Sequence, residues 1–194
     1  MEYLISKERF YSHIELVKKY MLLSQKYQTN IIEFRTMHEG SSSAHFFTCA
    51  KQDVSNSFEA FVSLITYETH FYEEWLIEET TEDNVGDILI NFINPLIDQF
   101  LFKNISPNEA QEKIGWIVND IKRLIADDTS RMFNEPSHWG IYINNKEIDD
   151  EQSNFNYILN SIVRAIGLII EWNEISIFYE TKDNYVLFSW ATSA

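Results

Sequence analysis

Basic side chains are missing from a long central part of the sequence. Residues 52 to 102 contain 11 aspartate and glutamate residues and neither lysine nor arginine. This stretch supplies most of a formal net charge of −15. An anionic surface repels nucleic-acid phosphates and anionic membrane surfaces, and it speeds the encounter with basic molecules. We therefore expect no direct nucleic-acid binding and no membrane binding, and we expect a basic protein partner.

Cysteine and glycine are also scarce. The single cysteine, Cys49, cannot form an internal disulfide, and the N-terminal residues lack the pattern of a secretory signal, so we expect a cytoplasmic protein. A glycine-rich phosphate loop needs several glycines close together, whereas the five glycines here are scattered. We therefore expect no nucleotide cofactor, and no other cofactor motif is present.

Long apolar runs are absent as well. The longest apolar stretch, residues 88 to 102, is interrupted by asparagine, proline, aspartate and glutamine, and it falls short of the roughly 20 apolar residues that span a bilayer. What is present is core material, because 45% of the 194 residues are hydrophobic and 15% are aromatic. A chain of this length and composition predicts a single globular domain over residues 1–194.

Helical spacing of apolar residues, together with capping residues, predicts about five helices. The helix that follows Ser106-Pro107-Asn108-Glu109 has a serine cap, a proline at its first position and a capping-box glutamate. A helix over residues 56 to 79 is favoured by length, although the segment LITYETHFY is rich in β-formers. The five helices are expected to start near Ser6, Asn56, Asn84, Ser106 and Ser153.

Strand signals are shorter. Residues 32–36 and 45–49 are expected to form a hairpin or a pair of edge strands, and Asn144-Asn145 is a plausible two-residue turn between two strands. Residues 175–180 and 185–191 predict a C-terminal β-hairpin. The expected fold class is therefore α+β, helix-dominated, with a small antiparallel sheet that includes this hairpin.

The segment EEWLIEETTEDNVGD, residues 73–87, concentrates seven carboxylates around a tryptophan. A helix would turn Trp75 and Leu76 inward and leave the acids in water. Like charges at these spacings oppose one another, and a basic partner would relieve that repulsion. A second acidic cluster lies at residues 149–151. The predicted partner-binding residues are Glu73, Glu74, Glu78, Glu79, Glu82, Asp83, Asp87, Asp149, Asp150 and Glu151.

The main functional hypothesis is therefore a protein-binding module that neutralises a basic protein. In size, acidity and aromatic content, the chain resembles the immunity proteins that inhibit bacterial nuclease toxins, and also phage inhibitors that mimic DNA. This resemblance implies an inhibitor with an anionic binding surface.

Two alternatives remain open. The first is a small metal-dependent or thiol enzyme built on His70, Glu73, His138 or Cys49, because His70 and Glu73 would share a helix face at metal-ligand spacing. His45 and Cys49 would lie about 13 Å apart on one strand, which is too far to share a proton. The second alternative is a homo-oligomeric structural protein that associates through Phe178, Phe188 and Trp190.

Overall fold

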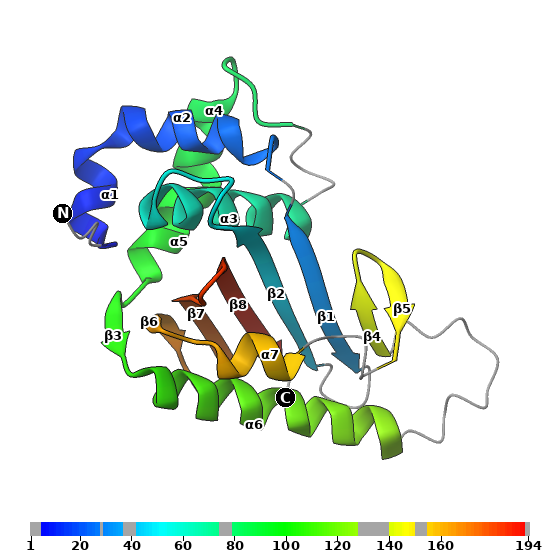
Figure 1. Cartoon of the computed structure of the whole chain (residues 1–194). Coiled ribbons are helices and arrows are strands. Elements are labelled where there is room, and N and C mark those ends of the chain that lie inside the picture. Colours follow the sequence, from blue (N-terminus) through cyan, green and yellow to red (C-terminus); the bar gives the residue numbers. More distant parts are fainter. Residues whose placement is uncertain are drawn as a thin grey trace.

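An eight-stranded antiparallel sheet runs through the protein, with helices on both of its faces (Figure 1). The computed structural model describes residues 5–27, 29–36, 42–73, 79–127, 140–149 and 155–192. The strand order is β3-β6-β7-β8-β2-β1-β4-β5. The strands are β1 (Asn30–Thr36), β2 (Ser42–Ala50), β3 (Lys103–Ile105), β4 (Gly140–Ile143), β5 (Lys146–Ile148), β6 (Arg164–Ile170), β7 (Glu174–Glu180) and β8 (Asn184–Thr192).

The helices divide into two groups, one on each face of the sheet. The first face is covered by α1 (Lys7–Ser12), α2 (Ile14–Ser24), α3 (Ser57–Tyr72), α4 (Val85–Ile88), the π-helix η1 (Leu89–Ile93) and α5 (Asn94–Gln99). The second face is covered by α6 (Pro107–Asp127) and α7 (Phe155–Asn160). Figure 1 shows the sheet between these two layers.

Each layer builds its own hydrophobic core against the sheet. On the first face, Phe58 and Phe61 of α3 pack in one cluster with Phe47 of β2 and Phe178 of β7. On the second face, the apolar stripe of α6 packs against the alternate residues of the same strands, which include Phe46 and Phe188. The central strands are therefore buried on both faces and are rich in apolar residues throughout.

Local signals placed several elements correctly. The Asn56 side chain caps α3 by accepting hydrogen bonds from the amides of Phe58 and Glu59, and Ser106 caps α6 by accepting one from the amide of Glu109. Asn144 and Asn145 adopt φ angles of 49° and 64° in the turn between β4 and β5, as a two-residue hairpin turn requires. The predicted C-terminal hairpin is confirmed as β7 paired with β8.

The predicted helix-dominated fold with a small sheet is wrong, although the α+β class is confirmed. The error lies mainly in the segment that begins near Ser153. Among its described residues, which start at Phe155, only α7 is helical and β6 follows it. Both faces of β6 are covered, so its apolar run has no period of two and its isoleucines fit helical spacing by coincidence. Strands β1 and β2 form the expected hairpin, but both lie inside the sheet rather than at its edge.

Two helix boundaries also differ from expectation. The first predicted helix is divided at His13 into α1 and α2. The helix expected over residues 56 to 79 ends at Tyr72. Residues 74–78, which include Trp75 and Leu76, lie outside the described residues. Among the residues that are described, no helix combines the length and the apolar character needed to cross a bilayer.

Candidate functional site

A row of polar side chains crosses the first face of the sheet, beneath α3. Glu33 on β1 lies opposite His45 on β2. His45 in turn lies opposite Ser189 on β8, and Ser189 lies opposite Ser176 on β7. We call these four residues the polar row. Because burying polar groups is costly unless they are hydrogen-bonded, a polar row inside an otherwise apolar core marks this part of the sheet as a candidate site.

One end of the polar row is an ionised cluster. The Arg35 Nε donates a hydrogen bond of 2.7 Å to Glu33 Oε2, and His45 Nε2 lies 3.4 Å from the same oxygen. Burial opposes the charge of Glu33, but the hydrogen bonds from His45 and Arg35 outweigh that effect, and the pKa of Glu33 is lowered. A carboxylate only accepts hydrogen bonds, so in this contact the hydrogen is carried by His45 Nε2.

Tyr72 and Ser189 connect this cluster to Glu68 on α3. The Tyr72 hydroxyl lies 2.8 Å from His45 Nδ1, within hydrogen-bonding distance. Ser189 hydrogen-bonds both Tyr72 and Glu68. Glu68 and Tyr72 are four residues apart in α3 and therefore point from the same side of the helix. A continuous polar chain thus leads from Glu33 to Glu68.

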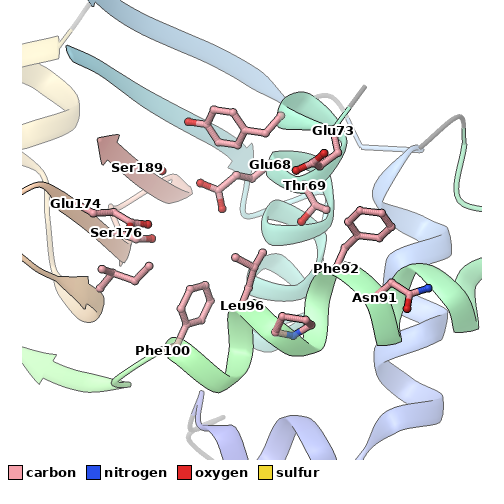
Figure 2. Close-up of a pocket in the computed structure, with 13 residues that line it drawn as sticks. Glu68, Thr69, Glu73, Asn91, Phe92, Leu96, Phe100, Glu174, Ser176 and Ser189 are labelled. Atoms are coloured by element: carbon pink, nitrogen blue, oxygen red, sulfur yellow. The ribbon is translucent and has the colours of Figure 1, made fainter. Parts of the chain in front are cut away.

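A pocket of about 320 Å³ lies where this chain ends, between α3, the segment η1–α5 and strands β6, β7 and β8 (Figure 2). Its volume is at the small end of the range for ligand sites, which is about 300 to 1,000 Å³. Its apolar wall consists of Phe92, Pro95, Leu96, Phe100 and Ile169. Its acidic residues are Glu68, Glu73 and Glu174, and among the described residues that line it none is basic.

Glu68 is the most deeply placed of these three acids, at 8% exposure. Figure 2 shows its carboxylate pointing from α3 towards Ser189 and Glu174. Burial raises the pKa of Glu68 to about 7, the hydrogen bond from Ser189 lowers it, and the charge of Glu174 raises it further. Glu68 therefore exchanges its proton near neutral pH, which is unusual for a carboxyl group.

Ser176 contributes a second unusual group to the pocket. Its side chain is 4% exposed, and its Oγ has no hydrogen-bond partner among the described residues. A buried hydroxyl without a partner costs free energy of about 1 to 3 kcal/mol. This hydroxyl lines the pocket next to Ser189, so a bound ligand can supply the missing hydrogen bond.

The opposite side of α3 faces a different pocket, of about 560 Å³. His70 lines this second pocket together with Arg35 and Tyr67, and its Nε2 lies 2.7 Å from Thr80 Oγ1. Glu73 lines the first pocket instead. His70 and Glu73 therefore line different pockets, and within the described ranges no three His, Cys, Asp or Glu residues are grouped so that they could hold a metal ion.

The acidic residues predicted to bind a partner are only partly described. Glu79, Glu82 and Asp83 are exposed on the segment that leads into α4, and Asp87 is exposed within α4. Glu73 is half-buried at the end of α3. Asp149 is exposed after β5, the edge strand farthest from β3, so it belongs to a different element. Glu74, Glu78, Asp150, Glu151 and His138 lie outside the described residues.

The remaining candidates are buried. Cys49 is 1% exposed, and burial, aided by the charges of Asp53 and Glu59, raises the pKa of its thiol to about 12. A thiol in this state is a poor nucleophile. Phe178, Phe188 and Trp190, which were expected to offer an association face, all lie in the two hydrophobic cores.

Comparisons of this chain with models of protein families, with curated proteins and with solved structures found no significant match. Sequence reasoning missed Glu68, Glu174, Ser176 and Ser189. The available signal was a polar residue between two apolar ones in a strand, as in Ile175-Ser176-Ile177 and Phe188-Ser189-Trp190, but only the strand register shows that these residues are neighbours.

Proposed function

We propose that the protein binds a basic protein partner through the acidic surface formed by Glu79, Glu82, Asp83 and Asp87. The observation that carries this proposal is that all four side chains are exposed and none forms an ion pair within the described residues. By contrast, Asp98, an acid of the same lysine-free stretch, pairs with Lys7 at 2.6 Å. Unpaired acids on one segment favour a partner that supplies lysine and arginine.

One residue of this acidic surface, Asp87, lies near the first pocket along the helical run. Asp87 and Asn91 are one helical turn apart in the run α4–η1, and Asn91 lines that pocket. Glu73, at the end of α3, also lines this pocket.

The kind of partner follows from the charge. A net charge of −15 supports an inhibitor that neutralises a basic enzyme, and we propose an immunity-type role against a basic protein such as a nuclease toxin. We expect this interaction in the cytoplasm, where the lone thiol of Cys49 stays reduced.

The test compares two double variants that change the net charge equally. Glu82→Lys/Asp83→Lys reverses two charges of the acidic surface, whereas Glu112→Lys/Glu171→Lys reverses two exposed charges, one on α6 and one in the turn between β6 and β7. Partners are recovered at low salt, identified by mass spectrometry, and used to measure association rates. We expect the first variant alone to slow association, by roughly tenfold.

Salt gives an independent check. Between about 50 and 500 mM salt, screening should weaken the wild-type complex more than the complex of Glu82→Lys/Asp83→Lys. If both double variants associate as fast as the wild type, the acidic surface does not carry the interaction and the proposal is wrong.

A further inference from the structure

We propose that the pocket between α3, α5 and strands β7 and β8 is a binding site for an organic cation, in which an ammonium or guanidinium group is carried on an apolar stem. This inference goes beyond the proposed function, because it concerns a small-ligand site that can be tested without any protein partner. The chemistry fits a free alkylamine as well as a lysine or arginine side chain of a partner.

The lining of the pocket favours a ligand that carries a positive charge. Three carboxylates, those of Glu68, Glu73 and Glu174, approach it from two sides. In the part of the chain that the structure describes, no lysine or arginine lines the pocket. Figure 2 shows Glu68 on α3 facing Glu174 and Ser176 on β7. The carboxylates are not grouped closely enough to ligate one metal ion. An ammonium or guanidinium group, with several N–H donors directed outward, suits acceptors that are spread in this way.

The opposite wall of the pocket is apolar and favours a ligand with an apolar stem. Phe92, Leu96 and Phe100 project from η1, α5 and the residue after α5 into the same space (Figure 2). Side chains such as lysine bury their methylene groups against apolar surfaces while the charged end reaches polar groups. A volume of about 320 Å³ is too small for a large drug-like ligand and suits a stem of a few carbon atoms.

The buried hydroxyl of Ser176 is the independent sign that this space receives a ligand. Its Oγ has no partner among the described residues, although the side chain is almost fully buried and lines the pocket. A bound N–H group would donate to this oxygen and end its unpaired state.

Binding should depend on pH, because Glu68 faces the cation. On its own helix, Glu68 has Tyr72 and Glu73 as polar neighbours in the pocket lining. The strands opposite contribute Glu174 and Ser176 from β7 and Ser189 from β8. The segment η1–α5 adds Asn91 and apolar side chains. The pKa of Glu68 is about 7, and lysine and arginine side chains stay protonated well above this pH. If only the ionised form of Glu68 binds, affinity rises about tenfold between pH 6 and pH 8.

The test is calorimetric titration of the full chain with pairs of ligands that differ in charge. The cationic probes are hexylamine, capped lysine amide and capped arginine amide, and the neutral probes are hexanol, capped norleucine amide and capped citrulline amide. We expect each cation to bind at least about tenfold more tightly than its neutral counterpart. Near pH 7, the heat should vary with the ionisation enthalpy of the buffer, because binding expels the proton of Glu68.

Three variants make the test specific. Glu68→Gln keeps the shape and a hydrogen-bond acceptor for Ser189, and it should remove the tenfold pH dependence. Ser176→Ala should weaken binding by about two- to tenfold. Glu171→Gln, an exposed acid outside the pocket lining, is the control and should bind as the wild type does.

The outcomes separate the sources of the cation and also decide the proposal. If the capped amino acids bind more tightly than hexylamine, the natural cation is a side chain of a partner. If hexylamine binds more tightly, the natural cation is a free amine. If the neutral probes bind as well as the cations, or if no cation binds at millimolar concentration, the cation site is refuted. A failure of this kind leaves the charge-reversal test of the acidic surface unaffected.

Discussion

Replacing Glu68 by glutamine should make the protein more stable at neutral and alkaline pH. In the unfolded chain, a glutamate loses its proton near pH 4.5, whereas burial raises the pKa of Glu68 in the folded protein to about 7. Glu68 therefore loses its proton at a lower pH in the unfolded chain than in the folded protein. As the pH rises from about 4.5 through 7, the wild-type protein progressively loses stability through this group.

The size of the effect follows from the two pKa values. Each unit of difference is equivalent to about 1.4 kcal/mol, so the wild type loses about 3 kcal/mol of unfolding free energy by pH 8. Glutamine has no charge to develop and escapes this loss. For a chain of this length, the gain at pH 8 corresponds to an increase of roughly 6 to 12 °C in Tm.

The assay is urea unfolding of wild type and Glu68→Gln at pH 5, 6, 7 and 8, followed by tryptophan fluorescence. All other titrating groups are common to both proteins, so their contributions cancel in the difference between the two curves. The unfolding free energy of the variant, relative to wild type, should rise with pH and level off above pH 7. A constant difference across this range would show that Glu68 ionises as in an unfolded chain and would refute the argument.

Two further predictions concern α3 and the core. Asn56→Ala should cost about 1 kcal/mol of unfolding free energy, measured by the same urea titrations, because the side chain accepts two backbone hydrogen bonds of 3.0 Å at the start of α3. Asn56→Ser, which retains a cap, should recover most of that loss, and an equal loss in both variants would contradict the capping role. The buried, protonated thiol of Cys49 should resist Ellman's reagent in native buffer and react rapidly in urea. Immediate reaction of the native protein would show that the thiol is accessible.

Features that depend on a few consecutive residues could be predicted from the sequence. The caps at Asn56 and Ser106 and the turn at Asn144-Asn145 were placed correctly because each acts on its own local backbone. Strand β6 could not be predicted in this way. Its residues are buried by helices on both faces, so the sequence carries no alternation that separates a strand from a helix.

The pocket could not be predicted because it depends on register. Glu68 lies between Tyr67 and Thr69 in α3 and has no local feature that distinguishes it from an exposed acid. Its partner Ser189 is more than 100 residues away in the sequence, and Ser176 reaches the same place only through the pairing of β7 with β8. The exposed acidic residues 79 to 87, in contrast, were visible at once as a charged segment, and their role in binding stays a prediction.

The pairing of β2 with β8 has a consequence for how the chain folds. The two strands pair over nine positions, from Ser42 opposite Thr192 to Ala50 opposite Asn184, in the middle of the sheet. During synthesis, β2 leaves the ribosome long before β8 exists. In the meantime its apolar side chains and the backbone groups that will pair with β8 are exposed. Such distant pairings fold slowly and favour association of nascent chains. The protein should therefore depend on chaperones most during the interval before its last strand is made.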